Sequence, residues 1–200
     1  LLFVNANLPA WTMVRALITA TEAKTAALQE LQAPSRYSSG LATGSGTDGA
    51  IVVSDRSSPR TFTFAGNHAK LGELIGRTVL RAVKEALFRQ TGLCPERQYD
   101  VFARLGRYGV TREALLRQGV NALRLEELSR EPELVTRAAL YAHLLDELNW
   151  GLLKEADVIE ACRALLGRAG AAVQISTDSK KPLTEILAEA FLQSLAPLAK

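Results

Sequence analysis

Apolar residues recur at helical spacing over two long stretches in the first ninety residues. In residues 10–31 the periodic positions are Val14, Leu17, Ile18, Thr21, Thr25 and Leu28. In residues 71–89 they are Leu71, Leu74, Ile75, Val79, Ala82, Val83, Ala86 and Leu87. Each set falls on one side of a helix, so both stretches are predicted to be long amphipathic helices. Short apolar or alternating runs at residues 1–4, 50–53 and 61–64 predict strands.

The pattern changes after Cys94, where helical spacing dominates and residues 172–175 alone suggest a strand. The helices expected there cover residues 98–105, 111–118, 132–150, 154–168 and 182–195. The sequence therefore predicts an α/β region at residues 1–93, with a small sheet packed by long helices. An all-α C-terminal extension is expected at residues 94–200.

Composition narrows the functional classes. The net charge of +3 comes from 24 Lys and Arg residues against 21 Asp and Glu, and the charges are interleaved along the chain. A phosphate-binding surface needs clustered positive charge, so we expect no nucleic-acid partner. No apolar run approaches the length of a membrane span, and Cys94 and Cys162 are expected to be reduced. Because the chain opens on Leu1 inside an apolar run, we expect it to be a fragment.

A glycine-rich loop supplies the first candidate chemistry. The segment from Thr43 to Gly49 contains Gly44, Ser45 and Gly46, whose small side chains let backbone N–H groups approach a ligand. The segment is neither a Walker A loop nor a dinucleotide-binding fingerprint, because a predicted strand follows it without a Lys-Ser/Thr pair. Thr47 and Asp48, at its end, place a hydroxyl beside a carboxylate. A plain connecting loop is the alternative.

Two further clusters carry titratable side chains. Glu22 and Lys24 lie two positions apart in the first long helix, so they point about 200° away from each other. His68 and Lys70 stand where the second long helix begins, and the helix dipole there favours a neutral imidazole that can act as a base. Surface charges and a capping histidine are the alternatives.

The helix at residues 132–150 offers metal-like spacing in His143, Asp146 and Glu147. No second histidine or cysteine is placed to complete a site, so we expect no metal.

Four segments resemble one family, the adenosylcobinamide amidohydrolases. They are VNANL at residues 4–8, ITATEAKTAAL at 18–28, ATGSGTD at 42–48 and AGNHAKLGELIG at 65–76, and they occur in the family's order. The resemblance covers about residues 1–93 and corresponds to the C-terminal half of the family domain. It implies a cytoplasmic hydrolase that acts in cobalamin salvage. Ser45 stands where the family pattern has Thr.

The reaction that the resemblance implies is hydrolysis of adenosylcobinamide to adenosylcobyric acid and aminopropanol. The corrinoid is then the substrate, and no cofactor is expected. We expect His68, Asp48, Glu22 and Thr47 to be catalytic. We expect Thr43, Gly44, Ser45, Gly46, Lys24 and Lys70 to bind substrate. In this hypothesis His68 or Glu22 activates water, while Asp48 orients His68 or protonates the amine.

Two other readings stay open at the sequence level. The chain is alternatively a non-catalytic module that binds a corrinoid or a protein, or a nucleotide enzyme whose glycine-rich loop holds phosphate. In each case the partners that the sequence suggests, besides the corrinoid, are a second copy of the chain or a missing N-terminal segment.

Overall fold

The structure is a computed structural model that describes residues 1–46, 48–167, 175 and 180–199. Its residues form two compact units. The first comprises Leu1–Arg36 and Leu41–Pro95, and the second comprises Tyr37–Gly40 and Glu96–Lys200. The expected fold class is confirmed, because a small parallel sheet with long helices is followed by a helical C-terminal part.

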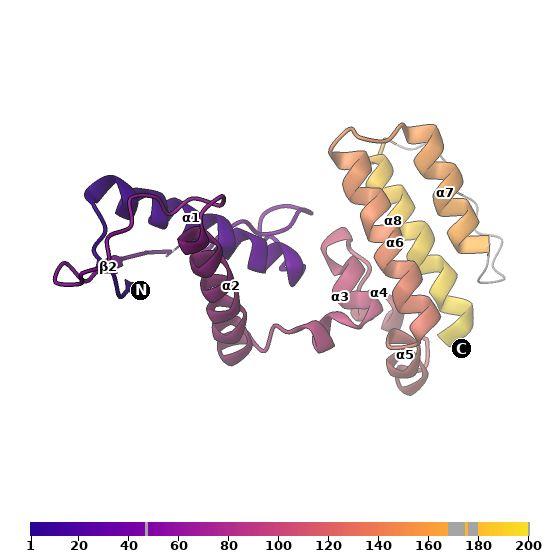
Figure 1. Cartoon of the computed structure of the whole chain (residues 1–200). Helices are drawn as coiled ribbons and strands as arrows, with labels where there is room; N and C mark the ends of the chain where they lie inside the picture. Colours follow the sequence, from indigo (N-terminus) through magenta and orange to yellow (C-terminus); the bar gives the residue numbers. More distant parts are fainter. Residues whose placement is uncertain (47, 168–174, 176–179, 200) are drawn as a thin grey trace. The chain divides into compact units, whose positions relative to one another are not determined.

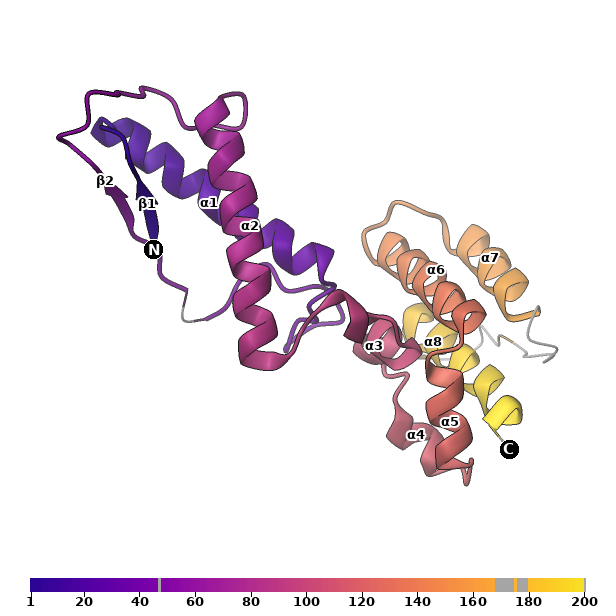
Figure 2. The ribbon, with the colours of Figure 1, turned by 60° about the horizontal axis from the view of Figure 1, so that its bottom comes forward.

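The first unit contains β1 (Leu2–Val4), α1 (Ala10–Glu30), β2 (Val52–Ser54) and α2 (Lys70–Thr91). The two strands are parallel, with Leu2 opposite Val52 and Val4 opposite Ser54. Figure 2 shows β1 and β2 side by side, and the long helices α1 and α2 cross each other in both views (Figures 1 and 2). Pro9 directly precedes α1, and Gly92 ends α2 in a left-handed conformation with φ 73°.

Small side chains bring α1 and α2 together. Ala16 and Ala20 of α1 form a buried cluster with Ile75 of α2 and with Ala65, which lies in the loop before α2. Residues 16 and 20 are one turn apart, so both methyl groups present the same side of α1 to its partner. Side chains this small allow two helix axes to approach closely.

The loop before α2 is fixed against both helices. The buried hydroxyl of Thr19 donates a hydrogen bond to the carbonyl of Ala65 at 2.9 Å. On the other side, Gly72 of α2 packs directly on the loop, because a Cβ built there would lie 2.0 Å from the carbonyl oxygen of Gly66. This part of the loop is therefore held from α1 by a hydrogen bond and from α2 by close packing.

The strand predicted at residues 61–64 is wrong. Thr61 forms only an isolated bridge with Asn7, and Phe62 and Phe64 remain exposed. Asn7 lies beyond the end of β1, and α1 begins three residues later, so no extended neighbour is long enough to pair with the whole segment. Alternating residues without a partner strand do not form a sheet.

The second unit is helical in its described part. Its longer helices are α5 (Ala122–Ser129), α6 (Pro132–Asn149), α7 (Glu155–Gly167) and α8 (Leu183–Leu195). Its shorter elements are α3 (Val101–Leu105), α4 (Arg112–Leu116) and three 3-10 turns, η1 (Pro95–Gln98), η2 (Gly106–Tyr108) and η3 (Ala196–Ala199). Figure 1 shows α6, α7 and α8 lying alongside one another.

One helix of this unit was not predicted from the sequence, and most of one suggested strand lies outside the described residues. Helix α5 was not expected; its N-cap is Asn121, whose side chain accepts hydrogen bonds from the amides of Leu123 and Arg124. Residues 172–174 of the suggested strand lie outside the described residues. Leu125 and Leu128, three positions apart on α5, are both buried, so this short helix packs through one apolar side.

The core of the second unit is a continuous cluster of buried side chains. At its centre the rings of Tyr141 and Phe191 meet edge to face, with centroids 4.9 Å apart. The Tyr141 hydroxyl donates to the carbonyl of Leu187 at 2.8 Å. Cys162 is free and fully buried, and burial raises the pKa of its thiol to about 12. This thiol is therefore protonated and unreactive at neutral pH.

A buried ion pair joins η2 to α6. Arg107 holds Asp146 with two hydrogen bonds, at 2.6 and 2.5 Å, and the Tyr108 hydroxyl donates to the same carboxylate at 2.8 Å. Asp146 is therefore part of a structural network. His143 is largely exposed, with only Glu147 nearby at 3.6 Å.

Candidate active site

An ion pair between α1 and the glycine-rich loop forms the first polar cluster of the α/β unit. The Nζ atom of Lys24 donates to Oδ2 of Asp48 at 2.5 Å. The backbone amide of Ser45 donates to the same oxygen at 2.7 Å, so the carboxylate also closes the loop onto itself. The hydrogen bond from Lys24, and next that from Ser45, lower the pKa of Asp48. Asp48 is thus a carboxylate at neutral pH.

Helix α1 also holds the start of this loop. The Thr25 hydroxyl donates to the carbonyl of Thr43 at 2.9 Å, and the Gln29 amide donates to the carbonyl of Ala42 at 3.1 Å. A Cβ at position 44 would lie 3.0 Å from Oδ2 of Asp48, so Gly44 leaves room for the ion pair. The loop is therefore attached to α1 over two successive turns, through Lys24 and Thr25 on one turn and Gln29 on the next.

The second polar cluster joins α1 to the loop before α2. The side-chain amide of Asn67 donates to Oε2 of Glu22 at 3.1 Å, and Arg15 lies 3.9 Å from the other carboxylate oxygen. His68 follows Asn67 directly, is exposed, and stands just before Ala69, the N-cap of α2. Asn67 was not assigned a role from the sequence, although it lies inside the AGNHAK segment.

The structure separates the ten predicted site residues into groups. Lys24 and Asp48 form an ion pair, and Thr43, Gly44 and Ser45 belong to the same loop as Asp48. Glu22 is hydrogen-bonded to Asn67, the residue that precedes His68 in the chain. Lys70 instead pairs with Glu73 of its own helix at 2.5 Å, and Gly46 has open space around its Cα. Thr47 lies outside the described residues.

The two clusters lie on different sides of α1. A helix turns by about 100° per residue, so Glu22 and Lys24 are separated by about 200° in the direction of the chain and by about 160° the other way round, over the side that bears Thr21. Lys24 accordingly meets the loop at Asp48, whereas Glu22 meets the loop at Asn67. The sector of α1 between them carries Thr21 and Thr25 near its centre.

A mostly apolar pocket opens beside the first cluster. It has a volume of about 520 Å³ and lies among α1, α2 and the two strands. Its apolar walls come from Leu1, Leu2, Leu17, Ile51, Val79 and Val83, and Lys24 and Asp48 are its charged lining residues. A ligand in this pocket would place an apolar group against the helices and a polar group against the ion pair.

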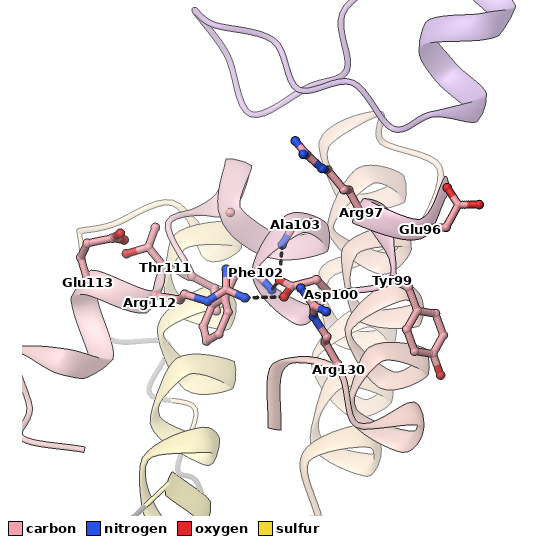
Figure 3. Close-up of a pocket in the computed structure, with 12 residues that line it drawn as sticks. Glu96, Arg97, Tyr99, Asp100, Phe102, Ala103, Thr111, Arg112, Glu113 and Arg130 are labelled. Carbon is pink, nitrogen blue, oxygen red and sulfur yellow. Dashed lines mark hydrogen bonds and ion pairs between the residues drawn. The ribbon is translucent and has the colours of Figure 1, made fainter. Parts of the chain in front are cut away.

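The second unit has a larger pocket of about 750 Å³, which Figure 3 shows. Two of its charged side chains, Asp100 and Arg112, form an ion pair. Asp100 caps α3 through the amides of Phe102 and Ala103 and accepts a hydrogen bond from Arg112 at 2.5 Å. The Arg112 guanidinium also lies over the Phe102 ring, 4.7 Å from its centroid, and approaches Glu126 at 3.4 Å. This network fixes α3, α4 and α5 to one another, which gives Asp100 and Arg112 a structural role.

Two general features concern ligands and membranes. Among the described residues, no three His, Cys, Asp or Glu side chains gather in a way that suits a metal ion. Within the same residues, none of the helices combines the length and the apolar character that crossing a membrane requires.

Comparison with known proteins finds similarity over the first part of the chain. An uncharacterized protein of Methanocaldococcus jannaschii is 48% identical over 91 residues, which cover 45% of this chain and 35% of that protein. The chain thus spans about a third of the length of the curated relative it matches. No solved structure matches the chain. The family model described as adenosylcobinamide amidohydrolase matches residues 1–95, which confirms the resemblance seen in the motifs of this part of the chain.

Proposed function

We propose that this chain hydrolyses the amide that joins the aminopropanol arm to the corrinoid in adenosylcobinamide, giving adenosylcobyric acid and aminopropanol. The observation that carries the proposal is the family match over residues 1–95. The geometry supports it, because two motif residues far apart in the chain, Lys24 and Asp48, form an ion pair that lines a mostly apolar pocket. A large, partly apolar substrate with an amide arm suits such a combination.

Amide hydrolysis requires a base for water, stabilisation of the tetrahedral oxyanion and a proton for the amine. In the proposal, His68 or Glu22 takes a proton from a water molecule while the oxygen of that water bonds to the carbonyl carbon of the amide. The carbonyl π electrons move to oxygen, and the ammonium of Lys24 stabilises that negative charge. The base then returns the proton to the nitrogen as the C–N bond breaks. The products are a carboxylic acid, which ionises, and the free amine.

Asp48 acts on Lys24 in this scheme. Its lowered pKa makes it a poor proton donor, and its carboxylate is already hydrogen-bonded to Lys24 and Ser45. It therefore orients the ammonium group, so Asp48 is a positioning residue in this scheme. The loop residues Thr43, Gly44, Ser45 and Gly46 are proposed to contact the substrate arm beside it.

The test is incubation of the chain with adenosylcobinamide, followed by chromatographic detection of aminopropanol and adenosylcobyric acid. Release of both in equal amounts supports the proposal, provided that Lys24→Gln abolishes most of it. A folded chain that binds the corrinoid without releasing aminopropanol would instead be a non-catalytic binding module, and the proposed hydrolysis would be wrong.

A further inference from the structure

Helix α1 is apolar on two sides, and only one of them is packed. Its alanine side packs against α2. On its outer side Trp11, Val14, Leu17 and Ile18 remain 67%, 59%, 37% and 43% exposed. A helix that is apolar on both sides is typical of a buried position, and a contiguous exposed apolar patch marks a binding surface. The outer side of α1 is thus expected to be covered by a ligand or partner.

Trp11, Val14, Leu17 and Ile18 form an apolar stripe that adjoins the polar residues of the candidate active site. At about 100° per residue, all four side chains fall within the sector bounded by Lys24 and Glu22. A groove of about 560 Å³ on this side is lined by Leu17, Ile18, Thr21, Glu22 and Thr25. Leu17 and Thr21 also line the pocket beside Lys24 and Asp48, so the two hollows adjoin along α1. The stripe and the polar residues are therefore parts of one surface.

We propose that the outer side of α1 is the seat of the corrin macrocycle, with the reacting amide arm lying over Thr21 between Glu22 and Lys24. This inference rests on the proposed function. From Trp11 to Thr21 the helix extends about 15 Å, so the stripe can support a ring much larger than an amino-acid side chain. The apolar faces of the ring lie on the stripe, and the hydroxyls of Thr21 and Thr25 meet the carboxamide groups at its edge.

A protein partner fits this surface less well. The four apolar side chains are far fewer than the roughly 20–30 residues that each partner contributes to a standard protein interface. A macromolecule seated there would also cover Thr21 and the edge of Glu22, and would block the approach to both polar clusters. A small-molecule substrate can instead contact the apolar stripe and the polar residues at the same time, because they adjoin on one surface.

Equilibrium dialysis of the full chain against adenosylcobinamide tests the inference. Bound corrinoid is read from its visible absorbance, which depends on the ring and is retained when the arm is hydrolysed. We expect Val14→Glu and Ile18→Glu each to weaken binding at least about tenfold, because a buried apolar contact is replaced by a charge. Phe88→Glu is the matched control; Phe88 lies on α2 and is 57% exposed. It should change binding less than about twofold.

The outcomes separate this inference from the proposed function. If wild type binds the corrinoid and both α1 variants bind it equally well, the seat is elsewhere and the inference is wrong, while the hydrolase proposal stands. If wild type, folded by circular dichroism, binds no corrinoid, both are wrong. If the variants convert a dimer to a monomer without weakening corrinoid binding, the stripe is a subunit interface. Should either glutamate variant misfold, Val14→Ser and Ile18→Ser make the same comparison with the same expected direction.

Discussion

The Nζ atom of Lys24 lies 2.5 Å from Oδ2 of Asp48, which joins the middle of α1 to a loop residue twenty-four positions further along the chain. Two segments with family motifs thus meet at one ion pair. Both partners are partly exposed, with 26% and 36% of their side-chain surface accessible, so the pair can face a substrate. Exposed pairs of this kind add little stability.

Removing the ammonium of this pair should abolish most turnover. We expect Lys24→Gln to lower kcat by about 10²–10³-fold, the usual effect of losing one group that stabilises an oxyanion. Lys84→Gln is the control, because Lys84 forms an ion pair between α2 and Glu30 of α1 in the same unit. Steady-state release of aminopropanol measures both variants. Equal loss in the two would mean that the effect is structural and that Lys24 has no special role.

Asp48 should stabilise the folded state only where it is ionised. Its pKa in the folded chain is lowered from the ordinary value of 3.8, so its contribution is fully present above pH 3.8. That contribution is lost as the pH falls through the folded pKa. We therefore expect wild type to unfold at a slightly higher urea concentration than Asp48→Asn at pH 7, and the difference to shrink below about pH 4. A difference that grows on acidification would contradict the assigned state of the carboxylate.

Asn67 should act through Glu22. If the hydrogen bond at 3.1 Å orients the carboxylate, Asn67→Ala lowers kcat, roughly tenfold, with little change in KM. In the Glu22→Gln background the same substitution should have almost no further effect, because the oriented group is already gone. Full additivity of the two substitutions in kcat would show that Asn67 and Glu22 act independently.

Two glycines of α2 should respond in opposite directions to the same substitution. A Cβ at Gly72 would lie 2.0 Å from the carbonyl oxygen of Gly66, whereas a Cβ at Gly76 meets nothing within 4 Å. Gly72→Ala should therefore lower the free energy of unfolding by about 1–3 kcal/mol. Gly76→Ala should raise it by about 0.5–1 kcal/mol through better helix propensity. Urea unfolding followed by circular dichroism measures both, and a tolerated Gly72→Ala would refute the close packing of α2 on this loop.

In the helical unit, Asp146 should be important for stability. Asp146→Ala leaves the Arg107 guanidinium buried without its bidentate partner, and the Tyr108 hydroxyl loses its acceptor. We expect a loss of about 3–5 kcal/mol in the free energy of unfolding. Glu147→Ala, one position along α6, loses only a distant contact with His143 and should cost less than about 1 kcal/mol.

The regular elements of the first unit were readable from the sequence because each has a local signal. The apolar spacing marked α1 and α2 to within one or two residues, and two short apolar runs marked the paired strands. The alternation at residues 61–64 predicted a strand that does not form, because a strand needs a neighbouring strand and the local pattern does not show whether one exists. Helix α5 was missed although Leu125 and Leu128 stand at helical spacing, because a helix of 8 residues spans about two turns and repeats its apolar pattern too few times.

For the candidate site, helical geometry alone indicated that Glu22 and Lys24 point in different directions. Which loop each one meets depends on contacts between distant segments, and spacing along the chain does not encode these. The sequence suggested that Asp48 acts with His68, whereas its carboxylate lies on Lys24 and Ser45. Asn67 lacked a predicted role because an amide in a turn is usually read as a backbone feature.

The most direct test of the hydrolase proposal is incubation of the full chain with adenosylcobinamide in H₂¹⁸O, with mass spectrometry of the corrinoid product. The account predicts adenosylcobyric acid that carries one ¹⁸O atom in its new carboxyl group, with an equal amount of aminopropanol released. It also predicts that Lys24→Gln reduces both by about 10²–10³-fold. Recovery of unchanged adenosylcobinamide from a folded sample, without labelled acid or aminopropanol, would contradict the account.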